Sequence, residues 1–317
     1  EKKEGRFQYN NEGKKETNIM KSWFLNSNVD FIKIRKFTFG ISLICIAIIA
    51  AKSFLGQLDY GIDFKGGHIL ELRPKNQNAN LLSLRKDIKS YGIKDAVVQN
   101  FGDMDYLIKM VDSKGIDMKK VQEFLKKDFT IRRHENIGPK VANDLMKDGI
   151  IASIMAIFAM FCYIWIRFNI PFAVCGIIAL IHDCIFVFGM YAVFGVEFNI
   201  TAIVAILITA GYSINDTIVI YDRVRAVLRA SDTKASLKDI INMSINKTLS
   251  RTFLTSLSTL IALLSLYFFG GEVVASYTAP IILGVVAGTY SSIFLAAPML
   301  LYVLNLAHDN NEESISV

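Results

Sequence analysis

The sequence lacks the short motifs that mark most enzymes and redox proteins. It contains no GxxxxGK[ST] phosphate loop, no HExxH metal pair and no GxSxG nucleophile turn. Cysteine is scarce, and because no two cysteines form a CxxC pair, neither a disulfide framework nor a metal site is indicated. We therefore predict a protein that is not an enzyme and that uses no cofactor or metal. All four cysteines fall in long apolar runs, where a thiol packs as a small hydrophobic group: Cys45, Cys162, Cys175 and Cys184.

Charged residues make up 20% of the chain but are rare in several long runs, and 52% of all residues are hydrophobic. A bilayer core about 30 Å thick needs roughly 20 mainly apolar residues per helical span. Because backbone polar groups must be hydrogen-bonded inside a membrane, each such run is expected to be a helix. We predict a membrane all-α bundle of six transmembrane helices, the first at 37–55 and the other five within 149–304. The runs are 37–55, 149–166, 170–194, 198–221, 253–269 and 278–304.

Basic residues gather on one side of these spans. Arg35 and Lys36 precede the first span, and seven Lys or Arg residues lie between Arg223 and Arg251. The connections on the other side, 196–197 and 270–277, carry none. Because Lys and Arg mark cytoplasmic loops, both termini are predicted to face the cytoplasm of a bacterial inner membrane.

The two ends of the chain are polar. We predict a partly disordered cytoplasmic segment at 1–36 and a cytoplasmic tail at 305–317. The formal net charge of +6 does not indicate nucleic-acid binding, because the basic residues lie beside the spans and are mixed with acidic ones. Membrane lipid is the expected surrounding of the chain.

Residues 56–148 have a balanced composition, with 17 Lys or Arg against 14 Asp or Glu, which is typical of a small soluble domain. Gly102 and Asp103 suit a tight hairpin between the two central strands. The order β-α-β-β-α-β predicts an α+β ferredoxin-like fold on the extracytoplasmic side. That fold indicates a binding or structural module and little more. The expected strands are 68–73, 96–101, 106–111 and 129–134, and the expected helices are 79–91 and 118–127.

Ionisable residues inside the predicted spans are the most informative, because an Asp at a helix centre costs about 2.5 to 3.5 kcal/mol on insertion scales. His182 and Asp183 lie in the third span, and Asp216 lies in the fourth. Helical steps back from Asp216 give Ser213, Tyr212 and Thr209, so one polar face should point into the bundle. A static hydrogen-bond set between helices remains the alternative interpretation of all three ionisable residues.

A second group of polar residues flanks this face. Asn215 and Thr217 stand next to Asp216, and Arg251 at the start of the fifth span could compensate its charge. A buried carboxylate and a nearby arginine are the parts that a proton relay requires. We therefore predict a proton relay formed by Asp216, Arg251, Asn215, His182 and Asp183.

Other membrane features have plainer interpretations. Asp222 and Arg223 follow the fourth span, where solvated interface charges are expected. Gly284 and Gly288 form a GxxxG pattern that favours close helix packing. An intramembrane aspartyl hydrolase built on Asp183 and Asp216 is a weak alternative, since no motif for activating water surrounds either residue.

Several ordered segments together resemble the SecF family from about residue 37 to residue 304. The motif residues are Asp63, Gly66 and Gly67 in a DFxGG segment, Gly138 and Pro139, the His182-Asp183 pair, Gly211, Tyr212, Ser213, Asn215, Asp216 and Thr217, then Asp222 and Arg223, Asn246 to Thr252, and Phe269 to Gly271. Ile137 replaces the usual Val before Gly138. Gly66 and Gly67 also predict a turn that leads into the first strand of the domain.

The resemblance implies one six-span half of a resistance-nodulation-division type transporter. It implies pairing with a second half, SecD, beside the SecYEG channel and the ATPase SecA, and use of the proton motive force to promote preprotein export. It also implies that Asp216 and Arg251 belong to the proton pathway. The alternatives are a half-transporter of the same superfamily for small molecules or lipids, and a scaffold without transport.

Overall fold

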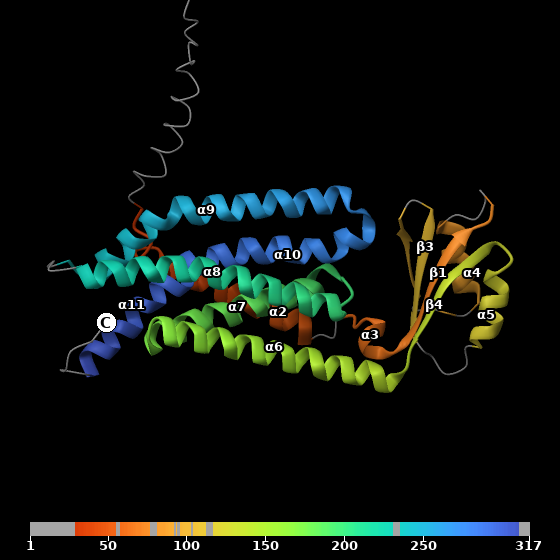
Figure 1. Cartoon of the computed structure of the whole chain (residues 1–317), viewed down its shortest axis with the longest axis horizontal. Helices are drawn as coiled ribbons and strands as arrows, with labels where there is room; N and C mark the ends of the chain where they lie inside the picture. Colours follow the sequence, from red (N-terminus) through yellow and green to blue (C-terminus); the bar gives the residue numbers. More distant parts are fainter. Residues whose placement is uncertain are drawn as a thin grey trace, which may run out of the picture.

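The computed structural model of the chain describes residues 29–54, 58–76, 81–91, 93, 96–102, 104–111, 117–230 and 235–310. Long helices lie side by side in a bundle, and a small sheet with two helices stands at one end of it (Figure 1). Within the described ranges, five helices are long and apolar enough to cross a membrane. The predictions for residues 1–28 and 311–317 lie outside the described residues.

The extracytoplasmic region predicted from the sequence contains a four-stranded antiparallel sheet with strand order β2-β3-β1-β4. The predicted strands and helices are confirmed, with ends that differ by at most three residues. Gly102 has a positive φ of 65°, as a tight hairpin requires, whereas Asp103 lies outside the described residues. The elements are β1 (Gly67–Pro74), α4 (Leu81–Ser90), β2 (Val97–Phe101), β3 (Asp105–Val111), α5 (Met118–Leu125) and β4 (Phe129–Ile137).

One face of this sheet carries the apolar core. Alternate residues of a strand point to the same face, and here they meet the apolar sides of α4 and α5. The core is formed by Leu70, Leu72, Leu84, Ile88, Val98, Ile108, Met110, Val121, Leu125 and Phe129, all at most 5% exposed.

A buried carboxylate with two half-exposed arginines links three strands. Asp105 at the start of β3 is 8% exposed. Its carboxylate accepts two hydrogen bonds from Arg73 of β1, at 2.7 and 2.9 Å, and one from Arg132 of β4 at 2.9 Å. These hydrogen bonds, first from Arg73 and then from Arg132, lower the pKa of the Asp105 carboxyl although burial opposes the shift.

We expect Asp105→Asn to destabilise the sheet by about 1 kcal/mol at pH 7, because both arginines are half exposed and water screens the attraction. A carboxyl whose pKa is lowered by folding stabilises above its unfolded pKa of 3.8, and that contribution disappears as pH falls through the folded value. Hydrogen exchange of the β1 and β3 amides should therefore differ between variant and wild type at pH 7, and the two should converge only as the pH falls below 3.8 and through the lowered pKa of folded Asp105. Glu123→Gln, which changes an exposed α5 carboxylate, should match wild type; a persistent difference at low pH contradicts the prediction.

The long helices extend beyond the apolar runs from which they were predicted. Helix α6 begins at Pro139 rather than at residue 149, and α9 begins at Leu237 rather than at residue 253. A helix can continue into water where polar residues follow its apolar face, so span length alone does not give helix length. The helices are α6 (Pro139–Arg167), α7 (Ile170–Phe194), α8 (Ile200–Ala230), α9 (Leu237–Phe269) and α10 (Gly271–Ser291).

The last predicted span is not one regular helix. Helix α10 runs into a π-helical turn, η1 (Ser292–Ala296), and continues as α11 (Ala297–Asn310). Pro280, which cannot donate a backbone hydrogen bond, lies inside α10. No sequence pattern indicated the π turn.

Two helices, α2 and α3, precede the sheet. Helix α2 (Arg35–Phe54) packs across α7, where Gly189 leaves room for Ile49: a Cβ at Gly189 would lie 1.9 Å from an Ile49 methyl carbon. Helix α3 (Ile62–Lys65) then joins the bundle to β1.

Candidate functional site

The polar face predicted on α8 is confirmed as buried. Thr209, Ser213, Asp216 and Thr217 are each at most 1% exposed. They share one side of the helix because their spacing follows the helical repeat. This side meets α7, α9 and α10.

The glycines of the GxxxG pattern bring α10 against this face, which confirms their predicted packing role. A Cβ at Gly284 would lie 2.3 Å from Thr209 Oγ1, and one at Gly288 would lie 2.9 Å from Ser213 Cβ. Only residues without a side chain allow backbones to approach so closely. Hydroxyl groups of α10 therefore reach both membrane carboxylates.

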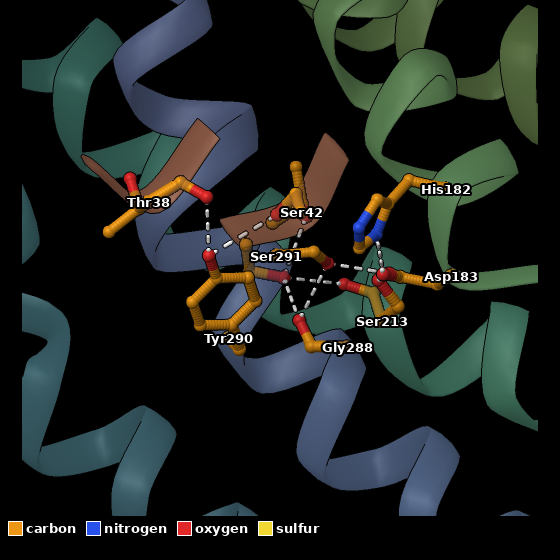
Figure 2. A network of polar contacts seen from close by, with 10 residues as sticks. Thr38, Ser42, His182, Asp183, Ser213, Gly288, Tyr290 and Ser291 are labelled. Atoms are coloured by element: carbon orange, nitrogen blue, oxygen red, sulfur yellow. Dashed lines mark hydrogen bonds and ion pairs between the residues drawn. The ribbon is translucent and has the colours of Figure 1, made fainter. Parts of the chain in front are cut away.

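Asp183 of α7 is fully buried, and three side chains surround it (Figure 2). Its Oδ1 lies 2.9 Å from Nδ1 of His182, and its Oδ2 accepts hydrogen bonds of 2.5 Å from Ser213 and from Ser291. The other ring nitrogen of His182 is buried without a hydrogen-bond partner. The carboxylate is thus held by three elements, α7, α8 and α10.

A second set of hydrogen bonds lies beside this carboxylate. Tyr290 of α10 donates to the backbone oxygen of Thr38 at 2.8 Å, and its hydroxyl lies 3.2 Å from that of Ser42 (Figure 2). Helix α2 is thereby linked to α10 next to His182.

Asp216 of α8 has a different surrounding. Thr289 of α10 donates to its Oδ2 at 3.4 Å, and the Thr289 hydroxyl lies 2.7 Å from that of Ser256 on α9. Tyr212, one turn before Asp216, donates to Ser256 at 3.0 Å. Asp216 therefore ends a chain of neutral hydroxyl groups that comes from α8, α9 and α10.

Arg251 is not paired with Asp216. Its side chain is exposed on α9, and it forms no salt bridge within the described part of the chain. It lies five residues before Ser256 on the same helix. In this arrangement Arg251 does not contact Asp216. Its charge can act on Asp216 by long-range electrostatics, or by direct contact after the helices move.

Asn215 lies apart from the buried face of α8. Its side chain is exposed on a different side of α8 from the buried Asp216, together with Gly211. The reason is geometric, since a residue next to Asp216 is turned about 100° around the helix axis. Asn215 thus does not join the buried cluster.

Thr217 and Asp222 also have defined partners, whereas Arg223 does not among the described residues. The Thr217 hydroxyl lies 2.9 Å from that of Ser292 in the π turn. Asp222 accepts a 2.7 Å hydrogen bond from Arg167, and both side chains are nearly half exposed. Arg223 has no salt bridge among the described residues, and its Nε is buried without a partner. The exposure of Asp222 agrees with a solvated interface charge.

The motif residues between Asp63 and Pro139 lie where the sheet region connects to the long helices, rather than near the carboxylates. Asp63 accepts a 3.1 Å hydrogen bond from the backbone of Ile200, at the start of α8. Gly66 has a φ of 80°, and a Cβ at Gly67 would lie 2.2 Å from the Met110 oxygen, so the predicted glycine turn is confirmed. Gly138 caps α6, whose first residue is Pro139.

Several residues of the site were not predicted. Ser256, Thr289, Ser291 and Ser292 supply hydroxyls to the two carboxylates and to Thr217. The run Thr289-Tyr290-Ser291-Ser292 inside an apolar stretch was the available signal. Among the described residues, no group of three or more His, Cys, Asp or Glu side chains could hold a metal ion.

Chemically, the arrangement provides two separate proton-binding groups. Asp183 with His182 is surrounded by donors on one side of α8, and Asp216 is reached by hydroxyls from α9 and α10. Hydroxyl groups both donate and accept, so they can remain bonded to a carboxyl group whether or not it holds a proton.

Comparisons with known proteins give a consistent result. The family described as protein export membrane protein SecD/SecF, C-terminal, matches residues 117–306. A protein translocase subunit SecF of Calditerrivibrio nitroreducens is 37% identical over 292 residues, covering 89% of this chain and 96% of the relative. A protein translocase subunit SecDF of Brucella abortus is 36% identical over 281 residues, covering 86% of this chain and 37% of the relative.

A solved structure agrees with the relatives. The crystal structure of SecDF, a translocon-associated membrane protein from Thermus thermophilus, matches with a TM-score of 0.76 at 30% identity. The match covers 90% of this chain and 39% of that chain, so the chain spans well under half of the SecDF protein. Sequence, fold and coverage together establish that this chain belongs to the SecD/SecF family of protein export membrane proteins.

Proposed function

We propose that this chain works as the SecF-type subunit of a preprotein translocase in the bacterial inner membrane, and that it uses the proton motive force together with SecD. Its relatives are named translocase subunits, and one SecF relative is matched over 96% of its length. The observation that carries the mechanism is Asp216, an almost fully buried carboxylate that is surrounded by neutral hydroxyl groups, with Thr289 donating to it at 3.4 Å.

Proton binding gives Asp216 two states. The ionised carboxylate only accepts hydrogen bonds, whereas the protonated group can also donate one. Thr289 and Ser256 can reverse the direction of their shared hydrogen bond in response. Because Arg251 is the motif arginine of the neighbouring helix, we assign it the role of compensating the ionised state when α9 moves.

Asp183 and His182 are assigned the second proton-binding position of the relay. Ser213 and Ser291 donate to Asp183, and the unpartnered nitrogen of His182 offers a place for a transferred proton. Asn215 is left out of the relay because its side chain is exposed.

Helix α2 is assigned as a sixth span, since its 20 residues suit the bilayer core and it packs on α7. The strand order β2-β3-β1-β4, with one helix after β1 and one after β3, supports a ferredoxin-like fold for the extracytoplasmic domain.

Both termini are assigned to the cytoplasm. The end of α11, the start of α2, the end of α8 and the start of α9 lie at the end of the bundle opposite the sheet (Figure 1). An impermeant thiol reagent added to intact cells should label a cysteine at Met104 and should not label one at Ser231. Labelling of both would contradict this orientation.

SecD is the proposed partner within the membrane. Helix α8 presents an exposed seam at helical spacing that includes a polar side chain, Asn215, which would otherwise meet lipid. The matched SecDF proteins are more than twice as long as this chain, which supports a second half that covers this seam. SecYEG, SecA and an extended preprotein complete the proposed assembly. The seam is Thr201, Val204, Ile208, Gly211 and Asn215.

The proposal is tested in inverted inner-membrane vesicles that contain SecYEG and SecD and receive SecA, ATP and a preprotein. We expect the proton gradient to increase the amount of protease-protected preprotein only in vesicles that also contain this chain. An equal increase in vesicles without the chain would overturn the proposal.

A further inference from the structure

The edge strand of the sheet is held by the first turn of a membrane helix. The backbone N–H of Asn100 on β2 donates to Glu272 Oε2 at 2.9 Å, and its side-chain amide donates to Glu272 Oε1 at 3.0 Å. The α9–α10 turn lies beside the sheet (Figure 1). Because β2 is at the edge of the sheet, an outward N–H needs a partner outside the sheet, and Glu272 provides it.

The glycines before Glu272 explain its position. Gly271 has a φ of 77°, and a Cβ at Gly270 would lie 2.4 Å from the Leu266 backbone oxygen. Only glycine makes this turn without strain. Glu272 is thereby placed at the start of α10, where the helix dipole favours a negative charge.

The second attachment between sheet and bundle is of a different kind. Two backbone hydrogen bonds join the segment before α3 to the α7–α8 connection: Gly61 N–H donates to the Phe198 oxygen at 2.8 Å, and Phe198 N–H donates to the Asp59 oxygen at 2.7 Å. Lys109 of β3 lies 2.9 Å from Glu197, and both side chains are less than one fifth exposed. This attachment has many bonds and is largely shielded from water. The Asn100–Glu272 contact has two bonds and is exposed to water, so it is the one that opens more easily.

Helix α10 connects this exposed contact to the carboxylates. Glu272 is in its first turn, and Thr289 and Ser291 near its other end bond Asp216 and Asp183. Pro280 interrupts the backbone hydrogen bonds between the two ends, and the π turn follows directly after Ser291. Both features are places where a helix bends or shifts its register.

We propose that Asn100 and Glu272 form a latch that docks the extracytoplasmic sheet on α10, and that movement of α10 at the membrane carboxylates opens and closes it. Asn100 and Glu272 are positioning residues, which hold the sheet against α10. The link to export rests on the proposed function, whereas the docking does not.

Docking is measured with spin labels at Met104, which is 71% exposed, and at Ser265, an exposed residue of α9, in the full chain with SecD in nanodiscs. We expect Glu272→Ala to raise the ratio of undocked to docked sheet about tenfold, which corresponds to about 1.4 kcal/mol. Asp148→Asn, which removes an exposed carboxylate of α6, should leave the distance distribution as in wild type. A wild-type distribution in Glu272→Ala overturns the latch.

Coupling is measured with the same labels in Asp216→Asn, which fixes the neutral state. We expect a changed docked fraction relative to wild type, and an unchanged fraction overturns the coupling.

A disulfide between Asn100→Cys and Glu272→Cys should abolish gradient-dependent export until a reductant is added. Full export by the oxidised protein also overturns the coupling. If docking changes in Asp216→Asn but export remains normal, the proposed proton relay fails and the latch stands. If export is lost in Asp216→Asn but docking is unchanged, the proposed proton relay stands and the coupling of the latch to the carboxylates fails.

Discussion

Replacing Asp216 by Asn is expected to remove at least nine tenths of the gradient-dependent export while the protein still inserts and assembles. Asn keeps the shape of the side chain and can still bond Thr289, but it remains neutral at every pH. A neutral residue costs less in the membrane than a charged one, so insertion should not suffer. The measurement is preprotein protected from protease in vesicles with and without a proton gradient.

Arg251 variants separate a relay from a packing role. Arg251→Met should cause a similar loss of gradient-dependent export, because the compensating cation is gone, and Arg251→Lys should keep part of it. Since Arg251 is exposed and forms no salt bridge with any residue that the structure describes, neither variant should destabilise the chain. Asp148→Asn serves as the matched carboxylate control. Wild-type export from well-expressed Asp216→Asn protein would leave Asp216 with a packing role only.

Gly284→Ala is expected to destabilise the bundle by about 1 to 3 kcal/mol, the usual range for overpacking. The added Cβ would lie 2.3 and 2.6 Å from two side-chain atoms of Thr209 and 2.9 Å from a methyl carbon of Val187. Helix α10 would have to move away from α8, and its hydroxyls would leave Asp183 and Asp216. Thermal unfolding in mild detergent measures the first effect, and export in vesicles measures the second.

A second substitution tests this explanation. Thr209→Ala removes both of the nearest atoms, so the double variant with Gly284→Ala should recover most of the lost stability. Thr209→Ala alone should be tolerated, because the Thr209 hydroxyl is buried without a hydrogen-bond partner. Gly40→Ala is the matched control, since nothing lies within 4 Å of its added Cβ. Equal stability of Gly284→Ala and wild type, or no recovery in the double variant, would show that this contact does not limit helix packing.

The sequence alone predicted the elements whose pattern follows from local chemistry. Apolar runs gave the long helices, because apolar side chains and bonded backbone are what a membrane requires. Alternation and turn residues gave the four strands and two helices of the sheet region. The spacing of Thr209, Ser213 and Asp216 gave a buried polar face, since the helical repeat fixes which residues share a side.

The tertiary structure decided which neighbours meet that face. Periodicity along α8 does not say that α10 supplies Thr289 and Ser291, because that contact depends on the close approach at Gly284 and Gly288. It also could not show that Arg251 stands apart from Asp216 or that Asn100 meets Glu272, which are contacts between residues distant in sequence. The helical repeat determines from the sequence in which direction each side chain points. The partners of that side chain depend on how the helices pack, and packing is decided by the shapes of both helix surfaces.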